Sequence, residues 1–390
     1  MSVLTLPPAL VRAARTLTSR VLLVADSYLP RLGGIELHVR DLATRLSEQG
    51  HAVTVVTATG ALPDEVPGGP FRVIRLQPAG ALGVVDPVLW SGAGRAELHE
   101  LVAAADVVHA HSSVVSPLSW AALRAAHRLG VPAVVTVHSM LPRGSAVPLA
   151  LALSSRRAGS LRWTAVSEAV AAPLRRATGA PVALLPNGID PAPWRGLPRS
   201  SGSGPFTVVT AGRFAARKRV LPLLGALRDL RASLPRDLPL QAVLVGDGPQ
   251  HRAARAFVQR HDMGDWVSLP GRRTRPELAE LFATADVYVA PAVWESFGLA
   301  ALEARCAGLA VAGMVGSGLS EFVTDGVEGA LARDDRHLAE VLAGWALERG
   351  RVDAIRRHNA TTDPRVTWAR VLPATLAAYE AAGARPSLRA

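Results

Sequence analysis

The 390-residue chain has a single cysteine, Cys306, and several other features are scarce or missing. One cysteine cannot form an intramolecular disulfide or supply a cysteine-rich metal cluster. No apolar run reaches the roughly 18 residues that a transmembrane helix needs, so we expect no such helix. Residues 1–20 lack a basic start followed by a long apolar core, so we expect no signal peptide. These absences favour a reducing, cytoplasmic location.

Acidic residues are outnumbered by basic ones, because 43 Lys and Arg against 32 Asp and Glu give a formal net charge of +11. The excess is spread over both halves of the chain without a long basic run. No motif combines aromatic and basic residues in the way that nucleic-acid binders do, so we expect no nucleic-acid partner. Anionic small molecules or an anionic membrane surface fit this charge equally well.

Lysine is almost absent, because the stretch TAGRFAARKRV (210–220) contains the only lysine of the chain, Lys218. An arginine-biased coding sequence could leave one lysine by chance. Alternatively, this position needs a compact ammonium rather than a planar guanidinium fork. Arg213 leaves the preceding strand and Lys218 begins the next helical region, so the two cations could hold an anion. A solvated basic loop is the plainer interpretation.

Apolar runs of strand length alternate with longer helical patterns along the whole chain. Strands that are apolar almost throughout are typical of parallel sheets covered by helices on both faces. The sequence therefore predicts an α/β fold with two doubly wound, Rossmann-like domains in series. The expected strands are 20–27, 51–58, 105–112, 133–139 and 162–167 in the first domain, and 206–213, 241–249, 266–271, 285–292 and 309–315 in the second.

A stretch rich in proline, glycine and serine, residues 184–205, separates the two sets of strands and predicts a linker. We expect an N-terminal extension at 1–19, a first domain at 20–193 and a second domain at 194–365. Ligands of such sheets bind at the carboxyl ends of the strands, so a cleft between the domains is the expected site.

Two groups of residues follow strands of the first domain. Gly33 and Gly34 precede a helix, where glycines let backbone N–H groups approach a phosphate, although a plain tight turn explains them as well. His109 and His111 end one strand, on the same face, and His138 ends the next. No Asp, Glu or Cys lies near these histidines at metal-ligand spacing, so we expect no metal site.

The stretch PAVWESFGLAALEARCAG (291–308) is the most informative part of the second domain. Glu295 lies in a loop after a strand, Gly298 begins a helix, and Glu303 lies on that helix. The amides at the helix N-terminus would face an anion. The two carboxylates beside it suit the hydroxyl groups of a sugar.

Ten short motifs carry a resemblance to a known family, and their order and spacing make it specific. Over residues 20–380 the chain resembles glycosyltransferase family four, the retaining nucleotide-sugar transferases of the GT-B fold. The motifs are PRLGGIELH, DVVHAHS, TVHS, TAVSEAV, LPNGID, AGRFAARKR, LVGDGP, ADVYVAPAVWESFGLAALEA, GSGLSEFVTDGVEGAL and the tail VTWARVL…AAYEAA.

The resemblance implies roles for the charged residues. Arg213 and Lys218 would bind the donor diphosphate, which explains a lysine kept among arginines. Glu295 would touch the transferred sugar and Glu303 the ribose. Arg219 stands where the family more often has glycine, which affects only the detail of this loop.

Further matches involve backbone groups and the acceptor side. The resemblance implies that Gly34, next to Gly33, lies near the diphosphate and that His111 faces the acceptor, with His109 and His138 beside it. It also implies that a C-terminal helix at about 366–383 packs back on the first domain. The backbone that meets sugar and diphosphate would come from Phe297, Gly298 and Leu299.

The activity that the resemblance implies is transfer of a hexosyl group from a nucleoside-diphosphate sugar to an acceptor hydroxyl, with retention by same-face attack. No D-x-D-type metal motif occurs, and RDDR (333–336) lies late in the chain, so we expect neither a metal nor another cofactor. The donor stays open between GDP-mannose, UDP-glucose and UDP-N-acetylglucosamine. The acceptor could be a sugar, a polyol or a lipid-linked molecule.

Two other functions and one location also fit the sequence. A nucleotide-sugar epimerase would share the phosphate site, and a non-catalytic partner subunit would share the fold. Residues 141–162 join an apolar stripe to arginines that include Arg156 and Arg157. Such a stripe can rest on the inner face of a membrane, although a buried helix with solvated ends is the simpler interpretation.

Overall fold

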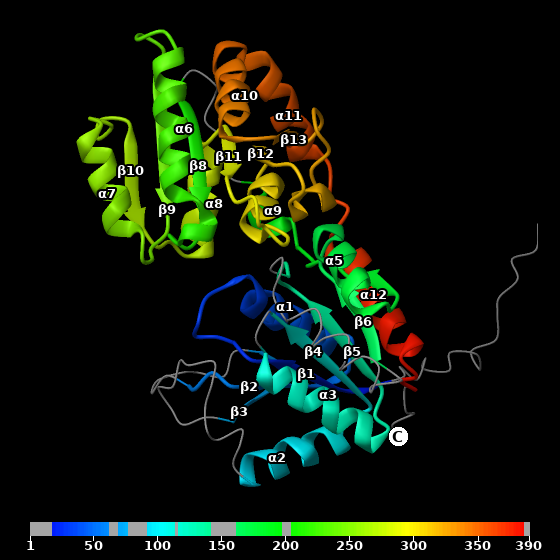
Figure 1. Ribbon diagram of the computed structural model, residues 1–390. Coiled ribbons are helices and arrows are strands. Elements are labelled where there is room, and N and C mark those ends of the chain that lie inside the picture. Colours follow the sequence, from blue (N-terminus) through cyan, green and yellow to red (C-terminus); the bar gives the residue numbers. More distant parts are fainter. Residues whose placement is uncertain are drawn as a thin grey trace, which may run out of the picture. The chain divides into compact units, whose positions relative to one another are not determined.

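The structure is a computed structural model that describes residues 18–61, 69–76, 92–113, 116–141, 161–196 and 204–385 (Figure 1). Two sheets organise these residues, and an α-helix lies between most pairs of successive strands in the sequence. All strand pairs with a defined register are parallel. The predicted α/β class with two Rossmann-like sheets is therefore confirmed.

The first sheet has seven strands in the order β3-β2-β1-β4-β5-β6-β7. The chain adds strands on one side of β1 and then crosses to the other side with β4, so the order reverses between β1 and β4. Its elements are β1 (Arg20–Ala25), α1 (Gly34–Glu48), β2 (Ala52–Thr57), β3 (Arg72–Arg75), α2 (Gly92–Ala103), β4 (Val107–Ser112), α3 (Pro117–Leu129), β5 (Ala133–Val137), β6 (Leu161–Ala165), α5 (Glu168–Thr178) and β7 (Val182–Leu184).

The second sheet has six strands in the order β10-β9-β8-β11-β12-β13, and its order reverses between β8 and β11. Its strands are β8 (Phe206–Ala211), β9 (Leu240–Val245), β10 (Val267–Gly271), β11 (Val287–Ala290), β12 (Ala310–Met314) and β13 (Gly329–Ala332). Its helices are α6 (Val220–Ser233), α7 (His251–Arg260), α8 (Arg275–Thr284), α9 (Leu299–Cys306), α10 (Asp335–Leu347) and α11 (Arg349–Thr361), and α12 (Trp368–Ala381) follows.

These two reversals matter for function. In an open parallel sheet, the loops on either side of the reversal leave the sheet in opposite directions and open a crevice at the carboxyl ends of the strands. The loops that follow β1 and β4, and those that follow β8 and β11, are therefore the expected places for a ligand. Most of the predicted site residues lie on or after these same strands, and His138 follows the neighbouring strand β5.

The core of the second sheet explains why its strands are apolar on both faces. Leu223, Leu224 and Leu227 of α6 are at most 1% exposed and belong to one cluster with Phe206 and Val208 of β8. Each buried side chain of this size contributes about 1.5–3 kcal/mol through removal from water. This packing makes the sheet a rigid base for its loops.

Three short strands escaped prediction. They are β3 (RVIR), β7 (VAL) and β13 (GALA). The predicted linker at 184–205 is also more ordered than expected, because Trp194 is buried in a short 3-10 helix and Ile189 pairs with Thr367. Part of that stretch, residues 197–203, lies outside the described residues.

Contacts between Cα atoms divide the chain into two compact units. One contains β1 to β5 and most of β6 with α1 to α3, and also the second half of α12; the other contains α5, β7 and the whole second sheet. The end of the first domain at residue 193 stays a prediction. The predicted extension at 1–19 and the segment 141–162 lie largely outside the described residues.

Among the described residues, no helix combines the length and the apolar character that crossing a membrane requires.

Candidate functional site

A pocket lies at the carboxyl ends of β8 and β11, where the order of the second sheet reverses. Five predicted residues line it: Arg213, Lys218, Glu295, Gly298 and Leu299. The structure thus brings together side chains that are up to 86 positions apart in the sequence. Two other predicted residues, Phe297 and Glu303, are not among the residues that line it.

Close backbone approach shapes the loop that follows β8. Gly246 has φ +144°, and a Cβ placed on it would lie 1.8 Å from the carbonyl oxygen of Gly212. Gly248 is similar, because its Cβ would lie 2.7 Å from the carbonyl oxygen of Phe214. Phe214 is buried and its N–H donates to the carbonyl of Asp247 at 2.9 Å. The glycines of LVGDGP therefore fix the position of the loop that carries Arg213, which is exposed and lines the pocket.

Lys218 and Glu295 form an ion pair inside the pocket, with 2.5 Å between Lys218 Nζ and Glu295 Oε2. The Lys218 side chain is 29% exposed and that of Glu295 is 11% exposed. A carboxylate this buried needs a charged partner, because its desolvation would otherwise be costly. The only lysine of the chain thus has a defined contact rather than a place in a solvated loop.

Arg219 follows Lys218 and adopts a left-handed conformation, with φ +58° and ψ +37°. This region favours glycine, which agrees with the glycine that the family more often has here. The Arg219 side chain compensates through Asp335, which accepts hydrogen bonds from Nη2 at 2.7 and 2.5 Å. The departure from the family pattern is therefore a strained residue held by an ion pair.

We expect Arg219→Gly to be more stable than Arg219→Ala by roughly 1 kcal/mol, since only alanine keeps the left-handed strain. Both variants lose the ion pair between Arg219 and Asp335. The two side chains of this pair are 29% and 39% exposed, so the loss of the pair has the same small effect on the stability of each variant. Urea unfolding of both variants measures the difference. An alanine variant as stable as the glycine variant would contradict this account.

The loop after β11 and the start of α9 form the wall of the pocket opposite Lys218. Gly298, the N-cap of α9, has φ +92°, which allows the chain to turn sharply from loop to helix. The first residues of α9 line the pocket, and the amides of a first helical turn have no partner within the helix. Such amides and the helix dipole favour an anion at this end.

A second glycine contact holds this wall in position. A Cβ on Gly318 would lie 2.1 Å from the carbonyl oxygen of Ser296, and the Gly318 N–H donates to the carbonyl of Glu295 at 2.8 Å. Ser167 Oγ also donates to the carbonyl of Ser296 at 2.6 Å. Phe297 is buried against Phe322, with ring centroids 5.5 Å apart. The loop is thus fixed on both sides before any ligand binds.

Glu303 is nearly buried and forms an ion pair with Arg275 at the start of α8. Glu303 Oε1 accepts from Arg275 Nε at 2.9 Å and lies 2.8 Å from Nη2. Sequence reasoning missed Arg275, because it lies 28 positions before its partner and has no motif of its own.

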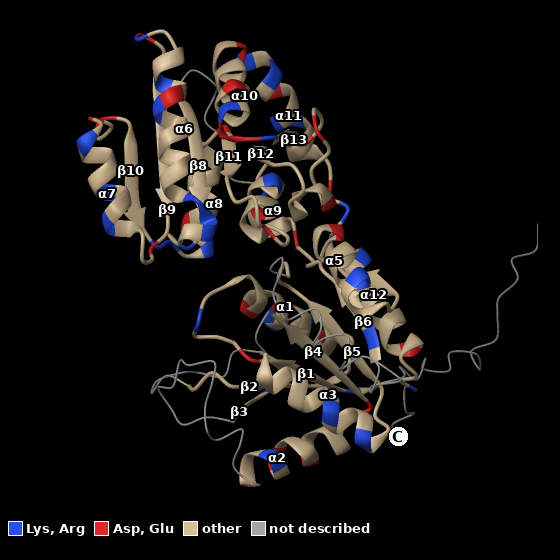
Figure 2. Cartoon of the chain, in the orientation of Figure 1, with Lys and Arg blue, Asp and Glu red and all other residues tan. Residues whose placement is uncertain are grey.

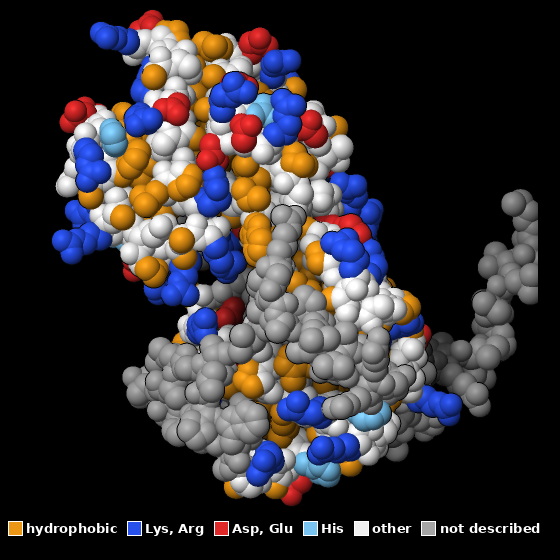
Figure 3. Space-filling view, in the orientation of Figure 1, with side chains coloured by type: hydrophobic (Ala, Val, Ile, Leu, Met, Phe, Trp, Pro, Cys, Tyr) orange, Lys and Arg blue, Asp and Glu red, His pale blue; other side chains and the backbone are white. Residues whose placement is uncertain are grey.

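Basic side chains gather near the start of α8 and the carboxyl end of β9, at the same edge of the second sheet (Figure 2). The space-filling view shows this patch at the surface (Figure 3). Arg272 and Arg273 lie between β10 and α8, and their side chains are 74% and 41% exposed. The edge therefore suits an anionic ligand.

In the first sheet, α1 begins at Gly34 and Gly33 is its N-cap, with an extended backbone (φ −171°). A Cβ on Gly33 would lie 2.4 Å from Glu36 Oε2, whereas a Cβ on Gly34 would meet nothing within 4 Å. Space at Gly34 is thus open at the N-terminus of a helix of 15 residues. This geometry agrees with the predicted phosphate contact and leaves it a prediction.

His109 is held entirely by the protein. Its Nδ1 lies 2.9 Å from Tyr379 Oη and its Nε2 lies 2.7 Å from Thr136 Oγ1. Burial lowers the pKa of His109 to about 3, so its ring is neutral at pH 7. These contacts favour a structural role that ties α12 to β4 and β5, rather than contact with an acceptor.

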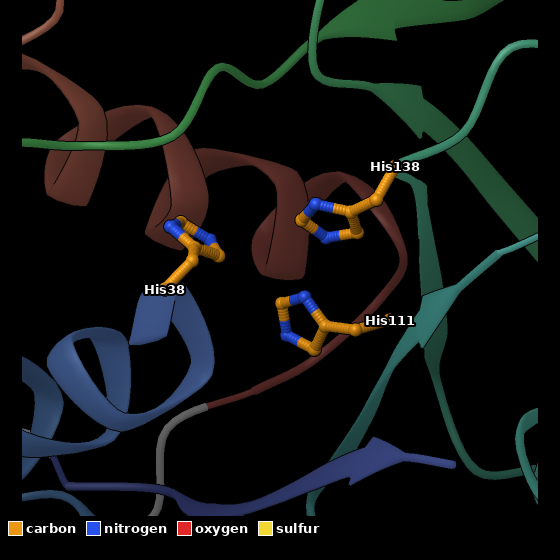
Figure 4. Close-up of side chains that lie close together, drawn as sticks. All are labelled: His38, His111 and His138. Carbon is orange, nitrogen blue, oxygen red and sulfur yellow. The ribbon is translucent and has the colours of Figure 1, made fainter. Parts of the chain in front are cut away.

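Three other histidines lie together at the carboxyl ends of β4 and β5 (Figure 4). They are His111 on β4, His138 directly after β5, and His38 on α1, and each is at most 5% exposed. One ring nitrogen from each lies within 4.8 Å of the other two. Burial lowers the pKa of His38 to about 4. Sequence analysis grouped His111 and His138 but missed His38.

Two family models together match most of the chain. The model described as Glycosyltransferase Family 4 matches residues 32–193. The model described as Glycosyl transferases group 1 matches residues 198–359. The first thus covers most of the first sheet with its histidines, and the second covers the whole second sheet with its pocket.

Curated relatives match over nearly their whole length. The chain is 30% identical over 400 residues to a D-inositol 3-phosphate glycosyltransferase of Pseudarthrobacter chlorophenolicus, covering 90% of each chain. It is 29% identical over 405 residues to a glycogen synthase of Mycobacterium tuberculosis, covering 93% of this chain and 95% of the relative.

Solved structures share the fold at lower identity. HepE of Anabaena, crystallised with UDP and glucose, has a TM-score of 0.71 and 19% identity, covering 92% of this chain and 99% of its own. Sucrose-phosphate synthase of Thermosynechococcus elongatus has a TM-score of 0.70 and 22% identity, covering 93% and 98%.

Proposed function

The chain belongs to glycosyltransferase family 4 and is a glycosyltransferase of the GT-B fold, and we propose that it transfers a hexosyl group from a nucleoside-diphosphate sugar to an acceptor hydroxyl. One observation carries the proposal. A cation, a carboxylate and a helix N-terminus meet in one pocket at the reversal point of the second sheet.

The pocket suits the chemistry of this transfer. As the bond from sugar to phosphate breaks, negative charge grows on the departing diphosphate. Arg213, Lys218 and the first amides of α9 would stabilise that charge, because they already line the pocket where it develops. Glu295 stands beside Lys218 and would accept hydrogen bonds from the hydroxyls of the transferred sugar.

The proposal includes retention and independence of metal. Retention rests on the family resemblance and would follow from attack on the same face of the sugar that the leaving group departs from. Arg213 and Lys218 supply the positive charge that a divalent ion provides in other transferases. No metal or other cofactor takes part in the proposed step.

The donor and acceptor are proposed only as classes. The crystal structures of HepE with UDP and glucose and with UDP-glucose support a uridine nucleotide, and GDP-mannose stays an alternative. The acceptor is a sugar, a polyol such as an inositol phosphate, or a lipid-linked molecule. We place the enzyme in the cytoplasm, where a lipid-linked acceptor would bring it to the membrane surface. The comparisons give no support to an epimerase.

A thermal-shift screen of nucleotide sugars tests the proposal, followed by product analysis with a labelled donor. We expect one base and one sugar to raise the unfolding temperature most. The same donor should release its nucleoside diphosphate and label an acceptor in the presence of a metal chelator. A labelled donor that is converted to a different nucleotide sugar, without release of the diphosphate, would instead indicate an epimerase.

We expect Glu303→Gln to weaken binding of the nucleoside diphosphate roughly 10- to 150-fold, because a charged hydrogen bond is worth about 1.5–3 kcal/mol. Calorimetric titration measures the affinity. A 2′,3′-dideoxy nucleotide is the matched control, since it lacks the hydroxyls that Glu303 would contact and its affinity should change little. Equal weakening of both nucleotides would show that the substitution acts on the pocket as a whole.

A further inference from the structure

The three buried histidines at the carboxyl ends of β4 and β5 have the arrangement of a metal-binding site. One ring nitrogen of each of His38, His111 and His138 lies within 4.8 Å of the other two. Figure 4 shows the three rings around one shared space. The side chain of His38 comes from α1, and those of the other two histidines come from the ends of two strands. We propose that this cluster binds one divalent transition-metal ion and that it prefers Zn²⁺.

Rigid elements carry the three side chains. His38 lies on α1 beside Val39 and Leu42, which are at most 1% exposed and anchor that face of the helix. His111 pairs in register with Thr136 of β5, and His138 follows that strand directly. Ligands on packed helices and strands hold their positions better than ligands on loops, which favours a specific ion.

The ring nitrogens of the three histidines must move slightly closer together to bind an ion. Zinc binds imidazole nitrogen at about 2.0–2.1 Å, which sets ligand nitrogens about 3.4 Å apart in a tetrahedron. The ring nitrogens lie within 4.8 Å of one another, so they approach by at most about 1.4 Å on binding. Rotation of the rings about their side-chain bonds supplies this movement. Three imidazoles leave one coordination position for water or for a further ligand.

The donor set also selects the ion. Imidazole suits Zn²⁺, Co²⁺, Ni²⁺ and Cu²⁺, whereas Mg²⁺, Ca²⁺ and Mn²⁺ prefer oxygen ligands. No carboxylate belongs to the cluster of described residues. The rings of His109 and His111 lie against each other at a tilt, with centroids 4.2 Å apart, but both nitrogens of His109 lie within hydrogen-bond distance of Tyr379 and Thr136. The site is therefore a three-histidine site rather than a four-histidine one.

An ion bound here would affect sugar transfer without taking part in the chemical step. The family resemblance implies that His111 and His138 lie on the acceptor side, and this step of the inference rests on that resemblance and on the proposed function. A bound ion fixes both rings and occupies the space between them. Zinc should therefore inhibit transfer without weakening binding of the nucleotide, and a chelator should restore activity.

Metal titration of the chelator-treated full chain tests the site without any need for activity. We expect one equivalent of Co²⁺ to give the visible absorption of a four-coordinate ion, and Zn²⁺ to displace it. Competition with a chromogenic chelator should give a Kd for Zn²⁺ in the micromolar range or below. Mg²⁺ at high excess should not displace cobalt. Weak binding of several equivalents, without the cobalt absorption, would overturn the proposal.

Two variants connect the ion to the cluster. His38→Gln removes one of three ligands at similar volume, so we expect affinity for Zn²⁺ to fall about 100-fold or more and zinc inhibition to disappear with basal transfer retained. His99→Gln is the matched control, since His99 is an exposed histidine on α2. Unchanged zinc affinity in His38→Gln would overturn the proposal.

X-ray absorption of the zinc-loaded wild-type chain gives an answer that does not depend on a variant folding. We expect three imidazole ligands, and a coordination shell with fewer than three would contradict the assignment. Failure of the proposed function would look different. The chain would then bind zinc at the cluster and transfer no sugar from any donor.

Discussion

Lys218→Ala is expected to lower kcat/KM for transfer about 30- to 1,000-fold, or ~2–4 kcal/mol, because the leaving diphosphate loses a charged partner. Donor affinity should fall as well. The variant also leaves the buried Glu295 without its 2.5 Å partner, so part of the loss could come from a rearranged pocket. Lys218→Arg separates the two effects, since it keeps the charge for Glu295 but presents a wider, planar group to the phosphates. We expect the arginine variant to recover only part of the activity.

Steady-state kinetics with a labelled donor measures this prediction, and thermal unfolding shows that the fold is kept. Arg217→Ala is the matched control. Arg217 lies in the same 3-10 turn and is exposed, but it is not among the residues that line the pocket. The control should stay within a few-fold of wild type. Kinetics of Lys218→Ala near those of wild type would remove Lys218 from the site.

Much of the fold could be predicted because its strands follow a simple rule. A strand buried on both faces must be apolar along its whole length, as in RVLLVA of β1, and such runs stand out between helical patterns. Two of the three missed strands break that rule. β3 begins and ends with arginine, and three of the four residues of β13 are small. β7 is apolar but only three residues long. They pair because a neighbouring strand offers an edge, and no local signal shows this.

The residues of the candidate site could be predicted where a sequence motif contains them. The contacts between residues far apart in the sequence could not. The motif residues Arg213, Lys218, Glu295, Gly298 and Leu299 do line one pocket. The contact between Lys218 and Glu295 spans 77 positions, and only the order of strands β8 and β11 brings the two loops together.

The position of His38 near the other histidines could have been predicted from the sequence. Four residues before Leu42 and one before Val39, it lies on the apolar face that α1 turns to the sheet. A histidine on that face must be buried beside the strands that α1 covers. The end of β4, which carries His111, is next to β1 in the order of the first sheet. Helix periodicity and strand order together would have placed His38 near the other histidines.

Glu295→Gln is expected to lower kcat roughly 10- to 150-fold while the affinity for nucleoside diphosphate stays the same or rises. The loss reflects a charged hydrogen bond to the sugar worth about 1.5–3 kcal/mol. The gain in nucleotide affinity follows from the ion pair, since Lys218 no longer shares its charge with a carboxylate 2.5 Å away and attracts phosphate more strongly. A glutamine keeps the shape of the side chain, so the pocket should keep its form.

Separate measurements of turnover and of nucleotide affinity distinguish this account from a general loss of structure. Glu340→Gln on the exposed face of α10 is the matched control and should change neither quantity. Damage to the pocket would weaken the nucleotide and slow turnover together. Weaker binding of nucleoside diphosphate with turnover intact would mean that Glu295 serves the nucleotide rather than the sugar. Slower turnover with unchanged or stronger nucleotide binding would show that the carboxylate beside Lys218 acts on the sugar that is transferred. Lys218 would then contact the phosphates of the donor and Glu295 its sugar.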